Sequence, residues 1–95
     1  MEAEFSKTFE IKNKLGLHAR AAAQFVRLSS KFNSNITIKK DGYTVDGKSI
    51  LGVLSLAAVK GTKIEVIADG NDSEQAFGEI EQLIECGFGE GIDIS

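Results

Sequence analysis

Residues 36–45 read ITIKKDGYTV, and this stretch decides the type of sheet. Ile36 and Ile38 alternate with polar residues, as in a strand that is buried on one face. Asp41-Gly42 is the two-residue signal of a tight hairpin turn, and the chain then returns as a short strand over 43–45. A hairpin near the centre of the chain predicts mainly antiparallel pairing in the sheet.

Patterns on both sides of the hairpin predict the remaining elements. Asp46-Gly47 closes the returning strand, and Asp69-Gly70 is expected to turn the chain before the last helix. The other expected elements are a strand over 5–11, a loop over 13–16, helices over 19–31 and 50–56, a strand over 63–68 and a helix over 73–85. This β-α-β-β-α-β-α order predicts an α+β fold, an open-faced sandwich with three helices on one face of a four-stranded sheet.

The two long helices are each expected to bury one stripe of side chains. In the first, the spacing places Ala22, Ala23, Val26 and Ser30 on one face, with Phe25 beside them.

The last helix has a start signal and a stop signal. Asp72 with Gln75 three residues later is typical of a capping box, and Gly87 and Gly89 end the helix. Its expected core stripe consists of Ala76, Phe77, Ile80, Leu83 and Ile84.

Length and composition favour a single soluble domain over residues 1–95, with a monomer as the simplest assembly. The net charge of -3 gives no basic excess for nucleic acid. No secretion signal or bilayer-length apolar run is present, so the cytoplasm is expected. Cys86, the only cysteine, cannot form an internal disulfide and is expected to serve as a small apolar residue near a helix end. The tail to Ser95 is expected to be mobile, although Ile92 and Ile94 could dock.

His18 is the only histidine and opens the first helix. The first N–H groups of a helix have no partner within it, and the helix dipole is positive there. This environment favours the neutral, nucleophilic imidazole, and the same N–H groups can hold phosphate oxygens. Arg20 adds a guanidinium that can pair with phosphate, and Arg27, two turns further, adds positive charge near that end. By position alone, a single histidine at a helix start more often caps the helix or lies on the surface than accepts a phosphoryl group.

Other site classes are poorly supported. One histidine and one distant cysteine do not form a ligand set for a metal ion. No Gly-x-Ser-x-Gly elbow accompanies the histidine, as a hydrolase would require.

Two segments resemble one known family. Residues 16–26, GLHARAAAQFV, resemble the active-site segment of HPr, the histidine-containing phosphocarrier of the phosphoenolpyruvate-dependent sugar phosphotransferase system. Residues 47–56, GKSILGVLSL, resemble the regulatory-serine segment of the same family. The spacing between the segments and the order of elements also match, so the resemblance covers nearly the whole chain.

The resemblance implies a role for each matching residue. His18 would take a phosphoryl group on Nδ1 from phosphorylated enzyme I and give it to an enzyme IIA domain, with Arg20 stabilising the phosphate. No metal or organic cofactor is implied. The partner-binding residues implied by the family are Gln24, Arg27, Lys48, Ile50, Leu51 and Leu54. From the residues alone, Val53 and Leu56 belong to the core.

Ser49 supports two interpretations. Serine is favoured at the N-cap of a helix, which explains Ser49 without regulation. In some members of the family, HPr kinase/phosphorylase phosphorylates this serine. A phosphate there would place about two negative charges beside the docking residues and repel an acidic partner.

One residue departs from the family pattern. The family usually has proline directly after the position of Arg20, where this chain has Ala21. Alanine can adopt the same conformation, so the helix is expected to form with a less rigid entry. Ala21 is therefore expected to affect the rate of phosphoryl transfer and the choice of partner protein.

Three hypotheses follow. The first is a phosphoryl carrier rather than a stand-alone enzyme. The second is a regulatory module of the same fold, or a nitrogen-branch paralogue with a different final acceptor. The third, a ligand-binding or ferredoxin-like α+β domain with coincidental motifs, is disfavoured by the two paired segments.

Overall fold

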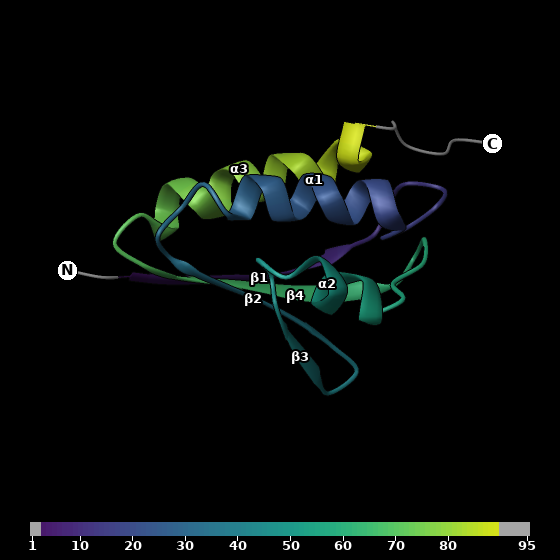
Figure 1. Ribbon diagram of the computed structural model, residues 1–95, viewed down its shortest axis with the longest axis horizontal. Helices are drawn as coiled ribbons and strands as arrows, with labels where there is room; N and C mark the ends of the chain where they lie inside the picture. Colours follow the sequence, from purple (N-terminus) through teal and green to yellow (C-terminus); the bar gives the residue numbers. More distant parts are fainter. Residues whose placement is uncertain (1–2, 90–95) are drawn as a thin grey trace.

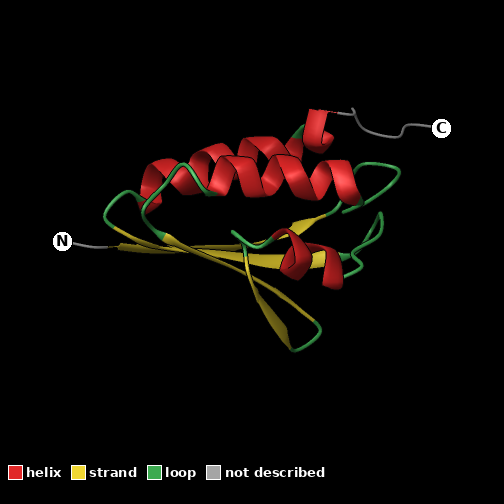
Figure 2. Cartoon of the chain, viewed as in Figure 1, coloured by secondary structure: helices red, strands yellow, loops and turns green. Residues whose placement is uncertain are grey.

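An antiparallel sheet of four strands, in the order β1-β4-β2-β3, carries the helices on one face (Figures 1 and 2). The computed structural model describes residues 3–89, so the expectation for Ile92 and Ile94 lies outside the described residues. The elements are β1 Ala3–Glu10, α1 Ala19–Ser29, β2 Asn35–Lys40, β3 Tyr43–Asp46, α2 Ile50–Ser55, β4 Lys63–Gly70, α3 Ser73–Glu85 and a short 3-10 turn, η1, Gly87–Gly89. The order of elements and the antiparallel sheet confirm the predicted fold class.

Strand β4 lies inside the sheet and pairs with two neighbours. Val66 is opposite Lys7 of β1 and opposite Ile38 of β2. The predicted hairpin joins β2 to β3. Asp41 and Gly42 have φ values of 50° and 84°, both in the left-handed region that suits a two-residue hairpin turn.

The core lies between the sheet and the helices. Alternate residues of β4 are buried, as expected for a sheet that is covered on one face. Helices α1 and α3 lie side by side over that face in Figure 1. The largest fully buried side chains include Phe9, Ile38 and Val66 from the sheet and Phe25, Val53, Ile80 and Ile84 from the helices. The stripe expected for α3 is confirmed, with Phe77 and Leu83 half-buried at its margin.

The buried face predicted for α1 was wrong by about one position. Its buried residues are Ala21, Ala22, Phe25 and Ser29, whereas Ser30 is exposed. Phe25 is the largest apolar residue of the helix, and directing it inward rotates the small residues 23 and 26 to the margin. The hydroxyl of Ser29 donates to the carbonyl of Gly47 at 2.6 Å, which fixes this rotation. The helix ends at Ser29, two residues before the predicted end.

The capping box predicted for α3 does not form. Asp72 occupies the N-cap position but makes no side-chain bond to its own helix. Its carboxylate instead accepts from the amide of Asn33 at 2.8 Å, the amide of Ser34 at 2.9 Å and the hydroxyl of Ser34 at 2.5 Å. These bonds lower the pKa of Asp72, the Ser34 hydroxyl having the largest effect. We refer to this contact between the α1–β2 loop and the start of α3 as the Asp72 clasp.

The turn expected at Asp69-Gly70 lies two residues later. Both residues belong to β4, and the chain turns at residues 71–72. Gly70 has φ 153°, and a Cβ there would lie 2.5 Å from Ser34 Oγ. Close approach to the Asp72 clasp, rather than a tight turn, therefore accounts for this glycine.

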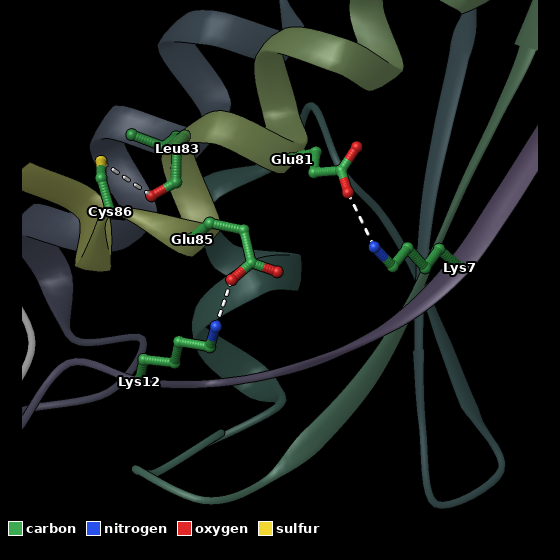
Figure 3. Close-up of polar contacts among 6 residues, drawn as sticks. All are labelled: Lys7, Lys12, Glu81, Leu83, Glu85 and Cys86. Carbon is green, nitrogen blue, oxygen red and sulfur yellow. Dashed lines mark hydrogen bonds and ion pairs between the residues drawn. The ribbon is translucent and has the colours of Figure 1, made fainter.

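Two ion pairs join the start of the chain to α3 (Figure 3). Lys7 Nζ lies 2.7 Å from Glu81 Oε2, and Lys12 pairs with Glu85. The hydrogen bond to Glu81 is the main cause that raises the pKa of Lys7. Both pairs remain partly exposed to solvent, so each is expected to contribute little to the stability of the fold.

The end of α3 is fixed by a buried aromatic residue that sequence reasoning missed. Gly87 ends the helix with φ 70°, as predicted, and Phe88 follows with φ 57° and a fully buried side chain. Cys86 is at the helix end, as expected, but it is exposed rather than packed as an apolar residue. Its thiol donates to the carbonyl of Leu83 at 3.3 Å (Figure 3).

Candidate functional site

His18 occupies the N-cap of α1. Its backbone is extended, with φ −80° and ψ −178°, and its carbonyl accepts the first helical hydrogen bond from Ala22. The side chain is half-buried, and its Nδ1 atom accepts from the backbone N–H of Arg20 at 3.3 Å. Because Nδ1 accepts this bond, the proton of the neutral ring is on Nε2. The Nδ1 lone pair therefore points toward the N–H groups that begin the helix.

The loop before His18 is fixed by two contacts. The Asn13 side-chain amide donates to the Gly16 carbonyl at 2.8 Å, and the Leu17 amide donates to the Ala58 carbonyl at 2.8 Å. Gly16 has φ 69°, and a Cβ there would lie 2.4 Å from the Ala58 oxygen. The His18 loop thus rests directly on the backbone of the loop after α2. The sequence did not identify Asn13 or Ala58 as residues that support this loop. The predicted loop over 13–16 was the only feature that pointed to Asn13.

The surroundings of the ring suit an anion. The first turn of an α-helix presents N–H groups without partners inside the helix. The first turn of α1 contains no acidic residue, so no carboxylate of that turn competes for these groups. Arg20, in the same turn, is exposed and supplies a guanidinium. A phosphoryl group on Nδ1 would meet amide hydrogens and this cation together.

Arg27 does not add charge beside His18 as predicted. It lies in the last turn of α1, so about 13 Å of helix axis separates the two residues. The prediction failed because two helical turns carry a residue to the other end of a helix of only 11 residues. Gln24 lies between Arg20 and Arg27 and is half-buried.

Ser49 occupies the N-cap of α2, as expected. Its Oγ atom accepts from the Gly52 amide at 3.1 Å. The preceding Lys48 is less available than the family resemblance implies, because its ammonium donates to the Phe32 carbonyl at 2.7 Å, beyond the end of α1. That contact holds the start of α2 against the end of α1.

The short helix α2 has a buried side and an exposed side. Val53 and Leu56 are buried, as expected from the residues alone. Leu51 is 77% exposed and Ile50 is 41% exposed, while Leu54 is half-buried against the core. These residues can offer an apolar surface to another protein.

Two further exposed apolar residues belong to the loops that support His18. Leu15 is 61% exposed and Val59 is 63% exposed. Sequence reasoning missed both, since a single apolar residue in a loop has no periodic pattern. The Cα of Val59 lies 2.8 Å from where a Gly16 Cβ would be, so the two loops present these residues near one another.

Within residues 3–89, no group of three or more histidine, cysteine, aspartate or glutamate side chains is arranged to hold a metal ion. No helix of this part of the chain has the length and apolar character needed to cross a membrane.

Comparisons with known proteins agree with this geometry. The family model described as PTS HPr component phosphorylation site matches residues 5–86. The phosphocarrier protein HPr of Neisseria meningitidis is 47% identical over 85 residues, covering 90% of this chain and 96% of that protein. The HPr-like protein Crh of Halalkalibacterium halodurans is 46% identical, covering 83% of this chain and 94% of that protein. The crystal structure of HPr from Thermoanaerobacter tengcongensis superimposes with a TM-score of 0.89 at 46% identity, covering 93% of this chain and 99% of that one.

Proposed function

Because the chain belongs to the HPr family of the phosphotransferase system, we propose that it carries a phosphoryl group on His18 from phosphorylated enzyme I to an enzyme IIA domain. The observation that carries the proposal is the hydrogen bond from the Arg20 amide to Nδ1 of His18, which directs the ring nitrogen toward the start of α1. The proposal places this relay in the cytoplasm, with the chain acting as a monomer.

The chemical step follows from the ring geometry. The Nδ1 lone pair attacks phosphorus, a P–N bond forms, and the bond from phosphorus to the donor's leaving group breaks with its electron pair. The ring can release its Nε2 proton, which balances the proton that the leaving group takes up. The Arg20 amide then donates to a phosphate oxygen in place of Nδ1, and the Arg20 guanidinium pairs with the phosphate. Transfer to the acceptor reverses these steps.

Partner proteins would dock on a surface that extends from the ring along α1 and α2. We assign this surface to Ile50, Leu51 and Leu54, with Gln24 and Arg27 on α1. Leu15 and Val59 extend the exposed apolar area on the loops that support His18. We include Lys48 in this surface because it directly precedes Ser49. Its ammonium is bonded to the Phe32 carbonyl.

A direct test uses purified enzyme I and phosphoenolpyruvate labelled on phosphorus. The chain is expected to take up acid-labile label, because a phosphorus–nitrogen bond is formed. The His18→Ala variant is expected to take up none, and the matched Ser49→Ala variant is expected to be labelled normally. Absence of label on the wild-type chain, with an enzyme I that labels another HPr, would contradict the proposal.

Regulation through Ser49 is a second proposed function, favoured by the resemblance of residues 47–56 to the regulatory-serine segment of the family. The Ser49 hydroxyl starts α2, and the exposed Ile50 and Leu51 follow it directly. A phosphate there would place negative charge next to the docking surface. Incubation with ATP and an HPr kinase is expected to give acid-stable label that is lost in Ser49→Ala and kept in the control Ser55→Ala. Equal label in Ser49→Ala and the wild-type chain would exclude this serine.

A further inference from the structure

Asn13 is a fully buried polar residue in the loop that leads from β1 to His18. Asparagine side chains are mostly exposed in proteins, and buried ones are held by hydrogen bonds. The nearby Ile11 is also fully buried, and its amide and carbonyl bond to the Thr62 carbonyl and the Gly61 amide, both at 2.8 Å. Asn13 therefore extends into the loop from a part of the backbone that is itself fixed.

Both the backbone and the side chain of Asn13 hold Gly16. The Asn13 carbonyl accepts from the Gly16 amide at 3.1 Å, and the Asn13 side-chain amide donates to the Gly16 carbonyl at 2.8 Å. Lys14 and Leu15, which lie between them, are exposed. The loop is therefore closed by the contacts of its buried residue and not by packing of its exposed ones.

The side-chain bond fixes the peptide group that joins Gly16 to Leu17. The carbonyl of this group accepts from Asn13, and its N–H donates to the carbonyl of Ala58 at 2.8 Å. The two supports come from the β1–α1 loop and from the loop after α2, which lie at the end of the molecule where α1 begins (Figure 1). Because hydrogen bonds are directional, this peptide plane cannot rotate without weakening one of the two bonds.

His18 is only one residue beyond this peptide group. Leu17, between them, has a buried side chain, so the plane of the Gly16–Leu17 peptide sets the direction in which the chain enters His18. The contact at the ring has little tolerance, because the Arg20 amide reaches Nδ1 at 3.3 Å, at the long end of hydrogen-bond distances. A small rotation of the loop would therefore break this contact and turn Nδ1 away from the start of α1.

We propose that Asn13 is a positioning residue for phosphoryl transfer. It acts through the Gly16–Leu17 peptide to direct Nδ1 of His18 toward the incoming phosphorus, and it does not touch the phosphoryl group itself. The effect on transfer rests on the proposed function, whereas the effect on the direction of the ring does not. A misplacement of about 1 Å can reduce a reaction rate about 100-fold, so partial release of the loop is expected to lower kcat about tenfold.

Two variants remove the donor and differ in the volume that they leave. Asn13→Ala deletes the side-chain amide, whereas Asn13→Leu keeps a similar volume at the buried position without a donor. Ser34→Ala is the matched control. Ser34 is also buried, and its hydroxyl belongs to the Asp72 clasp, beyond the other end of α1. Urea denaturation shows how much stability each variant loses.

The transfer is measured with enzyme I and phosphoenolpyruvate. Both Asn13 variants are expected to lower kcat about tenfold and to change the KM for the chain less than about twofold, because the docking residues on α1 and α2 are untouched. Ser34→Ala is expected to keep the wild-type kcat. The proposal would be overturned by a wild-type kcat in a folded Asn13 variant, by an equal loss in Ser34→Ala, or by failure of both Asn13 variants to fold.

NMR supplies a readout that a loss of stability alone does not move. The amide proton of Arg20 is expected to shift upfield in both Asn13 variants, because its bond to Nδ1 weakens, and to stay in place in Ser34→Ala. An unchanged Arg20 resonance would overturn the proposal even if kcat fell. If the wild-type chain accepts no phosphoryl group, the proposed function is refuted instead, and the Arg20 resonance still decides whether Asn13 directs the ring.

Discussion

At the residue scale, the loop that supports His18 contains an unfavourable backbone conformation. Ala57 has φ 50°, in the left-handed region that costs an alanine about 1–2 kcal/mol. Its neighbour Ala58 accepts the hydrogen bond from Leu17, directly before the histidine. The conformation at Ala57 is therefore maintained where two loops must meet, as is common near functional sites.

Replacement of Ala57 by glycine is expected to stabilise the protein. Ala57 is exposed, so the change removes no core packing, and glycine adopts positive φ without strain. After the greater flexibility of glycine in the unfolded chain is included, we expect the free energy of unfolding to rise by about 0.5–1 kcal/mol. Urea denaturation measures this.

Ala23→Gly in α1 is the matched control and should destabilise by about 0.5–1 kcal/mol, because its position is helical. A loss of stability in Ala57→Gly comparable to that of Ala23→Gly would show that the loop is not strained.

At the element scale, the Asp72 clasp joins two connections that are far apart in the sequence. A single carboxylate bonds both amides of the segment that leads into β2, while its own residue starts α3. Sequence reasoning placed α3 correctly but gave Asp72 the wrong partners. The actual partner Ser34 lies 38 positions away, and a local pattern such as the capping box carries no information about it.

The clasp predicts a specific dependence of stability on pH. The pKa of Asp72 is lowered in the folded state below its ordinary value of 3.8, so the charged form stabilises the fold. That contribution is complete above pH 3.8 and is lost as the pH falls through the lower, folded-state value. Asp72→Asn is therefore expected to be less stable than the wild-type chain at pH 7, with a difference that shrinks below pH 3.8. Urea denaturation across pH measures the difference.

Asp69→Asn, an exposed change at the end of β4, is the control and should follow the wild-type profile closely. Parallel profiles for the wild-type chain and Asp72→Asn over the whole acid range would contradict the assignment.

At the scale of the whole molecule, features set by neighbouring residues could be predicted from the sequence, whereas contacts between distant elements could not. The order of elements, the antiparallel sheet, the hairpin and the histidine at the start of α1 depend on patterns within a few residues, and the structure agrees with them. The contact of the His18 loop with Ala58 and the bond of the Lys48 ammonium to the Phe32 carbonyl depend on how elements pack. Residue spacing along one element does not determine these contacts. The position of His18 at the start of its helix could therefore be predicted, whereas the contacts that support the His18 loop could not.

The pairing of β1 with β4 has a consequence for synthesis of the chain. Ala3 is opposite Gly70, so strand β1 has no partner until about 60 more residues follow it. At about 5–20 residues per second, a ribosome takes roughly 3–12 s to supply them. Throughout that interval, Phe5 and Phe9 have no sheet on which to pack. The nascent protein must therefore wait for β4 before it can complete its sheet.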